Sequence, residues 1–375
     1  MKKLKTLAVL VLVIGILAMP TTARKNNPKP LIQMAILLDT SGSMEGLIEQ
    51  AKTQLWKIVN EMALAKQEGV SPQLEVALYE YGKSSIPASE GYMRMIVPLS
   101  VDLDLISEEL FKLRTNGGSE YCGMVIQSAV KGLKWTRSHD HLKVIFIAGN
   151  EPFTQGSVDY KNACKESITN GIIVNTIFCG NYQEGVNTHW KDGADLADGK
   201  YMNIDQDKKI AHISAPQDKE IVALGKQLNQ TYVAYGKTGG RKKERQEAQD
   251  LNAASVNEAV MVQRSVTKAS KQYTNVAWDL VDAEKEGKVK VEELDEEELP
   301  EEMRKMDKKE RKEYIEKKKK EREEIQEKIN RLKKERDKYV TEQRKKGASE
   351  ETLDQAIIKA VRDQAKKKNY KFEKK

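Results

Sequence analysis

The sequence predicts a doubly wound α/β domain, with a mostly parallel sheet and helices on both faces, followed by an extended α-helical coiled-coil tail. Two observations lead to this prediction. Over residues 31–236, short apolar runs alternate with amphipathic stretches, which is typical of a parallel sheet covered on both faces. Beyond residue 236, 71 of 139 residues are Lys, Arg, Asp or Glu. Such a segment is too charged to form a compact core of its own.

The elements follow from periodicity and from Gly and Pro breaks. We expect buried strands at residues 31–38, 143–148, 171–178 and 231–235, and a hairpin with a long connection from 74–81 and 93–99. We expect helices at residues 45–67, 102–113, 122–135, 158–169 and 217–228. In such sheets, ligands bind at the carboxyl ends of the strands.

The tail divides at Gly and Pro residues and at changes in charge. We expect a helical extension over 237–283, with one helix over 241–283, then an acidic hinge over 284–300 and a charged coiled-coil helix over 301–346. A short heptad seam in that helix predicts self-association; its members are Ile325, Ile329, Leu332 and Tyr339. A C-terminal helix within 347–375 either folds back on this helix as a hairpin or stands as a solvated single helix.

The N-terminus predicts export. Lys2, Lys3 and Lys5 precede a short apolar run that ends before Ala23, so residues 1–23 have the pattern of a signal peptide and 24–30 form a linker. The alternative is an uncleaved N-terminal anchor. No later segment is apolar enough to span a membrane, so we expect a periplasmic or secreted protein.

Composition bears on whether the protein binds nucleic acid, holds a cysteine metal site or has a catalytic triad. The net charge is +7, but the Lys runs of the tail lie among Glu residues, so we expect no nucleic-acid partner. Three cysteines, Cys122, Cys164 and Cys179, match no metal-site spacing, and their pairing stays open. We see no catalytic Ser–His–Asp or Cys–His pattern.

The residues Asp39-Thr40-Ser41-Gly42-Ser43 directly follow the first strand. A carboxylate and two hydroxyls on a tight loop suit a hard cation, and we expect Mg²⁺ or Mn²⁺. The alternative is an ion-free Asx-type cap on the following helix. Ser119 and Glu120 fall in a loop at the same edge, where they would join the site, cap a helix, or do both.

This loop and the strand order resemble the von Willebrand factor type A domain over residues 31–236. The resemblance implies that Ser41 and Ser43 coordinate a cation directly, as part of a metal-ion-dependent adhesion site, and that Asp39 acts through water. It further implies that Ser119 takes the place of a threonine ligand. An aspartate expected after the fourth strand is missing, because Gly149 stands there.

Other acidic or polar residues near Gly149 are candidates to compensate, namely Glu120, Asn150 and Glu151. More narrowly, the runs 146–153, 231–236 and 278–281 resemble a secreted bacterial subgroup of these domains. That resemblance implies no defined activity.

Three hypotheses follow. The first is a non-enzymatic extracytoplasmic protein-binding or adhesion module, with a partner carboxylate completing the cation site at Asp39, Ser41, Ser43, Ser119 and Glu120. The second is a metal-free scaffold that interacts through its coiled-coil tail. The third is an extracytoplasmic hydrolase using Glu80, Glu120 or Glu151.

Overall fold

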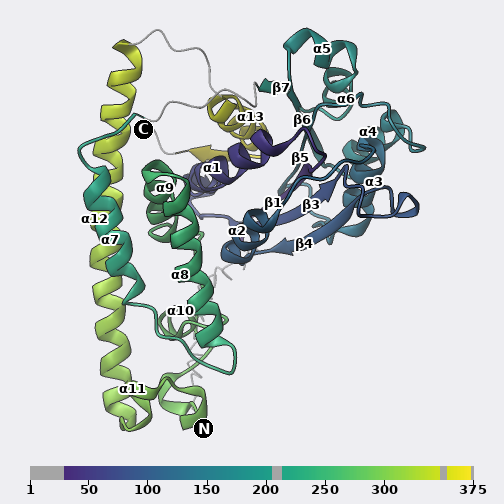
Figure 1. The fold of residues 1–375 in the computed structure, drawn as a ribbon. Coiled ribbons are helices and arrows are strands. Elements are labelled where there is room, and N and C mark those ends of the chain that lie inside the picture. The colour runs from purple at the N-terminus through teal and green to yellow at the C-terminus, as the bar shows by residue number, and fades with distance from the viewer. Residues whose placement is uncertain (1–28, 205–212, 347–352, 373–375) are drawn as a thin grey trace, which may run out of the picture.

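The computed structural model describes residues 29–204, 213–346 and 353–372 (Figure 1). The predicted signal peptide, most of the predicted linker, and the junction of the last two predicted helices lie outside these residues. Within the described ranges, no helix combines the length and apolar character that crossing a membrane requires.

A six-stranded sheet forms the centre of the molecule, in the order β4-β3-β1-β5-β6-β7. Only β3 and β4 pair antiparallel, which confirms the predicted mostly parallel sheet and its hairpin. The strands are β1 (Leu31–Asp39), β3 (Gln73–Tyr81), β4 (Arg94–Ser100), β5 (Leu142–Gly149), β6 (Ile173–Cys179) and β7 (Tyr201–Ile204).

Both faces of the sheet are buried. On β1, Met34 and Leu38 join one core, whereas Ala35 and Leu37 join the other, as expected from the two-residue period of a strand. The second core lies under helices α3 (Cys122–Gly132), α4 (Tyr160–Thr169), α5 (Tyr182–Asn187) and α6 (Trp190–Leu196). The first lies under α1 (Glu45–Met62), α2 (Leu103–Lys112), α7 (Asp218–Asn229) and much of the tail.

Several sequence predictions were wrong. Residues 231–235 form no strand, because only Ala234 makes a bridge, to Asp279; the sixth strand is β7, where we expected no element. The predicted single helix over 241–283 is three helices: α8 (Gly239–Val256), α9 (Glu258–Lys268) and α10 (Leu280–Lys285). Asn257 is extended, and its side chain caps α9 by accepting from the backbone N–H of Val260, so the chain turns there.

The acidic segment 284–300 is folded onto the rest of the tail. It contains the 3₁₀ turns η2 (Val291–Glu293) and η3 (Glu296–Glu298) and leads into α11 (Glu301–Arg304). A small core fixes it, because Val291, Leu299 and Met303 pack with Ile315 of the next helix. A shorter 3₁₀ turn, η1 (Ala88–Glu90), lies in the β3–β4 connection.

The long helix α12 (Lys308–Lys346) packs on its own chain. Its seam residues Ile329 and Leu332 are buried in the core shared with α7 and α9. Figure 1 shows α12 running alongside these helices. The seam residues that led us to predict self-association therefore pack largely against other helices of the same chain.

The C-terminal helix α13 (Leu353–Lys367) follows neither of the two arrangements left open by the sequence. It packs on α1 and β7, and the chain then forms β8 (Tyr370–Phe372), which pairs with β2 (Ala65–Gln67). The Tyr370 hydroxyl donates to the carbonyl of Leu31 at 2.9 Å. The end of the tail is thus attached to the first strand of the sheet.

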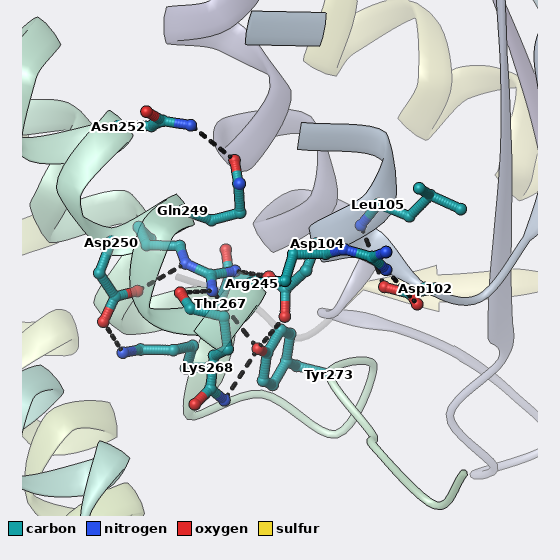
Figure 2. Close-up of polar contacts among 12 residues, drawn as sticks. Asp102, Asp104, Leu105, Arg245, Gln249, Asp250, Asn252, Thr267, Lys268 and Tyr273 are labelled. Carbon is teal, nitrogen blue, oxygen red and sulfur yellow. Dashed lines mark hydrogen bonds and ion pairs between the residues drawn. The ribbon is translucent and has the colours of Figure 1, made fainter. Parts of the chain in front are cut away.

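Buried charges join the tail to the α/β domain (Figure 2). Arg264 of α9 is fully buried and pairs with Asp104 of α2 at 2.6 Å and with Asp250 of α8 at 2.9 Å. Lys268 also pairs with Asp250, at 2.5 Å, and its burial lowers its pKa to about 8. The Tyr273 hydroxyl donates to Asp104 at 2.5 Å.

A second buried cation anchors α12. Arg322 donates to Asp279 at 2.6 Å, to Asp282 at 2.9 Å and to the Thr231 carbonyl at 2.6 Å. Its guanidinium lies 4.1 Å from the centre of the Tyr232 ring. Arg322 thus holds the buried residues Thr231 and Tyr232, which lie outside the sheet.

We predict that Arg264→Met destabilises the protein by about 3–5 kcal/mol, because it leaves Asp104 buried without its cation and Asp250 with Lys268 alone. The shift of the urea unfolding midpoint, followed by circular dichroism, measures this. The matched control is Lys112→Met, which breaks exposed pairs with Glu108 and Glu109 and should cost under about 1 kcal/mol. Equal shifts in the two variants would contradict the role given to Arg264.

Candidate functional site

Three loops meet at the carboxyl edge of the sheet, around the end of β1. The Asp39 loop leaves β1 between β3 and β5. Its Thr40 donates its backbone N–H to Tyr81 at the end of β3, and accepts at its carbonyl from the N–H of Asn116, both at 2.8 Å. The third loop begins at Asn150, just past β5. The predicted edge therefore brings these segments together.

Asp39 is fully buried at the base of this site. Its Oδ1 accepts from the backbone N–H of Ser41 at 2.7 Å, which closes an Asx-type turn. Its Oδ2 has no hydrogen-bond donor among the described residues. Helix α1 begins at Glu45, and its N-cap, Met44, makes no side-chain bond. The alternative of a side-chain cap on this helix is therefore wrong, and one carboxylate oxygen remains for another partner.

The two loop hydroxyls point toward one another. The Oγ atoms of Ser41 and Ser43 are 3.4 Å apart. Asn150 donates its Nδ2 to the Ser43 Oγ at 3.1 Å, and its Oδ1 is buried with no donor among the described residues. Two buried acceptor atoms, on Asp39 and Asn150, thus lie close to two hydroxyls. Buried acceptors without donors are costly, and a bound cation or ordered water would satisfy them.

Glu120 lies in the site beside Asp39, whereas Ser119 is placed only on the same loop. Glu120 is 2% exposed and faces Asp39, and its carboxyl accepts from the N–H of Glu151 at 3.3 Å. Ser119 is half-buried in the same loop. Neither residue caps the helix that follows, because the N-cap of α3 is Tyr121 and no side chain bonds there.

The pKa values of both carboxyl groups are raised. Burial is the main cause for both, and for Asp39 the facing Glu120 adds to it. Two buried carboxylates in contact cannot both ionise readily without a positive charge nearby. A proton shared between them, or a cation, supplies that charge. The donor set of two carboxylates and two hydroxyls fits a hard divalent cation.

Close packing explains why Gly149 carries no aspartate. A Cβ on Gly149 would lie 2.5 Å from the Tyr81 hydroxyl, 3.1 Å from the Trp190 ring and 3.2 Å from the Cβ of Asp39. The Tyr81 hydroxyl is held there because it donates to the Ala148 carbonyl at 2.9 Å. The Trp190 Nε1 donates to the Glu151 carbonyl at 2.8 Å. Two aromatic side chains therefore fill the place of the missing ligand.

The other acidic candidates, Glu80 and Glu151, form ion pairs or hydrogen bonds with neighbouring side chains. Glu80 is fully buried and pairs with Arg94 at 2.6 Å and with Lys83 at 2.9 Å. It also accepts from the Thr40 hydroxyl at 3.3 Å, so it anchors the Asp39 loop. Glu151 accepts at its carboxylate from Gln155 at 3.0 Å. Gln155 in turn accepts from the Glu120 N–H at 3.0 Å, so this loop holds Glu120 in place.

Sequence reasoning missed Tyr81, Trp190 and Gln155. Tyr81 could have been predicted from the sequence. It ends a predicted strand next to β1, and the parallel register places it opposite Asp39. Trp190 and Gln155 lie in segments whose path depends on tertiary packing.

Other candidate groups do not form sites within the described residues. No cluster of three or more His, Cys, Asp or Glu side chains with metal-binding geometry is found there. Cys122, Cys164 and Cys179 are all buried and unpaired with one another. The candidate cation site therefore depends on the serine hydroxyls as well as on Asp39 and Glu120.

These features define a doubly wound α/β domain with a carboxylate and hydroxyl loop at the end of its first strand. Several solved structures are similar to part of it. BatB from Bacteroides thetaiotaomicron is 15% identical, with 46% of this chain and 90% of that chain covered and a TM-score of 0.36. The SpRpn10 VWA domain is 17% identical, with 46% of this chain and 88% of that chain covered and a TM-score of 0.35.

A third similar structure is proximal thread matrix protein 1 from the mussel byssus, described with a zinc-occupied MIDAS motif. It is 13% identical, with 48% of this chain and 43% of that chain covered and a TM-score of 0.35. No family model matches the chain, and no curated protein matches it. The site is therefore inferred from the contacts of this chain itself.

We predict that Gly149→Ala destabilises the protein by about 1–3 kcal/mol, because the added Cβ overpacks against the Tyr81 hydroxyl. Thermal unfolding of the variant measures this. The control is Gly117→Ala, since a Cβ there meets nothing within 4 Å. In a Tyr81→Phe background the cost of Gly149→Ala should fall, and an unchanged cost would contradict the steric explanation.

Proposed function

We propose that this chain is a non-enzymatic, extracytoplasmic protein-binding module of the von Willebrand factor type A kind, with a degenerate metal-ion-dependent adhesion site. The observation that supports this most directly is the fully buried Asp39. Its Oδ2 has no donor among the described residues, and it faces Glu120 beside two serine hydroxyls. A buried carboxylate pair of this kind is expensive unless it serves a bound charge.

In this proposal Ser41 and Ser43 hold Mg²⁺ or Mn²⁺ directly, Asp39 acts through water, and Glu120 supplies the second carboxylate. Glu120 thereby replaces the charge that Gly149 cannot carry. Ser119, half-buried on the same loop, is a further hydroxyl within this segment. When bound, the cation offers a coordination position to a carboxylate oxygen of a partner protein.

The chain's own residues fix the geometry of this surface. Glu80, paired with Arg94 and Lys83, holds Thr40 in place, and Gln155 holds the backbone of Glu120. The loop is thus positioned before any partner arrives, which reduces the cost of ordering on binding.

A metal-free scaffold is the alternative, and one observation bears on it. The tail does not offer its apolar seam to a second copy, since Ile329 and Leu332 are buried within the chain. Such a scaffold would therefore have to interact through charged surfaces of the tail. Export rests on the N-terminal pattern, and cell fractionation of the full-length chain checks it.

We predict that Mn²⁺ binds the mature chain with one-to-one stoichiometry in isothermal titration calorimetry. Asp39→Asn should weaken binding at least tenfold, because it removes the buried negative charge. Asp195→Asn removes an exposed carboxylate that pairs with Lys191 outside the site, so it is the matched control and should bind Mn²⁺ as wild type does. An absence of heat and of any thermal shift at millimolar Mn²⁺ would favour the metal-free scaffold.

We predict further that the bound Mn²⁺ keeps an exchangeable water, which a partner carboxylate replaces. Water proton relaxation should rise when Mn²⁺ binds the protein, and should fall when a Glu-containing peptide is added. The same peptide with Gln in place of Glu is the control. Equal effects of the two peptides would argue against carboxylate recognition.

A further inference from the structure

Asn150 is the first residue after β5, and the cation site proposed above gives it no role. It follows Gly149, where close packing leaves no room for a side chain. Its own side chain is therefore the first one after the strand that reaches the candidate site. There its Nδ2 donates to the Ser43 Oγ at 3.1 Å.

The chain around Asn150 is held from several sides. The next residue, Glu151, donates its backbone N–H to the Glu120 carboxyl at 3.3 Å, and its carbonyl accepts from the Trp190 Nε1 at 2.8 Å. The Asn150 amide contacts Ser43 on the loop that follows β1. Asn150 therefore lies between the loop hydroxyls and the second carboxylate of the proposed cation site.

The side-chain carbonyl oxygen of Asn150 is unsatisfied. Its Oδ1 is buried, with no hydrogen-bond donor among the described residues, and the same holds for Oδ2 of Asp39. Because the Nδ2 already donates to Ser43, Oδ1 is the atom of this amide that remains for another partner. A buried acceptor without a donor is costly. Amide carbonyl oxygens are, however, regular ligands of hard divalent cations.

We propose that Asn150 is a direct ligand of the cation, through Oδ1. This inference rests on the cation site proposed above and adds one ligand to it. The turn after β5 then supplies a neutral oxygen from residue 150 in place of an anion from residue 149. The same side chain also positions the hydroxyl of Ser43 through its Nδ2. An ordered water donating to Oδ1 is the competing explanation, and the variants below separate the two.

The test is calorimetric titration of the full mature chain with Mn²⁺. Asn150→Ala should weaken binding about tenfold, because the ion loses one oxygen ligand. Asn150→Asp keeps an oxygen at this position and adds a negative charge, so it should tighten binding about tenfold, since the charge of the ligands sets the affinity for a hard cation. Thermal unfolding without metal checks that each variant is folded.

The matched control for the added charge is Asn330→Asp. Asn330 is exposed on α12, where its Nδ2 donates to the Ala269 carbonyl at 3.4 Å. In Figure 1, α12 lies apart from β5 and the loop that follows it. Affinity for Mn²⁺ should stay within about twofold of wild type, because solvent and salt screen a distant exposed charge.

A second measurement separates a ligand from a residue that only supports the loop. The water proton relaxation rate per bound Mn²⁺ depends on how many water molecules the ion coordinates. Asn150→Ala should raise this rate, because a water takes the position that Oδ1 leaves. Asn150→Asp should not raise it. A purely structural role would weaken binding in the alanine variant without this rise.

The failure of this assignment can be told apart from the failure of the cation site. If wild type and Asn150→Ala bind Mn²⁺ equally well, the site stands and Asn150 is not a ligand. If both Asn150 variants bind more weakly, only the donation to Ser43 matters, and the assignment is again wrong. If wild type binds no Mn²⁺ at millimolar concentration, the cation site itself is overturned, and this ligand with it.

Discussion

The buried cation of Arg264 connects most of this structure. It lies between Asp104 of the α/β domain and Asp250 of the tail, and its guanidinium is 4.7 Å from the centre of the Trp56 ring on α1. Desolvating a guanidinium is expensive, so the pairing contributes more to a unique arrangement than to net stability. Because α1 begins just after Ser43, this contact also fixes the helix that carries the candidate cation loop.

Ion pairs hold the charged tail both to the domain and to itself. Arg336 pairs with Asp218 and Arg362 with Glu61 of the domain, whereas Arg322 pairs with Asp279 within the tail. Composition indicates that the tail has no compact core of its own, and it largely shares one with the sheet: Val260, Ile329 and other tail residues lie in the same core as β1. The tail is thus a covering layer of the α/β domain more than a separate spacer.

The candidate site is shaped by two opposite packing effects. Asp39 and Glu120 lie together in a buried site, and burial raises the pKa of both carboxyl groups. At Gly149, in contrast, Tyr81 and Trp190 leave no room for a further carboxylate. The site therefore has two loop hydroxyls at Ser41 and Ser43, no carboxylate at Gly149, and a second carboxylate at Glu120.

The sequence by itself determined β1, β3, β4, β5 and β6, the strand-end position of Asp39, Ser41 and Ser43, and the glycine at 149, because buried strands and tight loops leave strong local patterns. It did not determine β7, the break at Asn257 or the packing of α12 and α13. Those depend on partners far away in the chain, which no local period encodes. Only the tertiary structure placed Glu120 against Asp39 and Tyr81 against Gly149, because side-chain contacts between loops arise only once the sheet has formed.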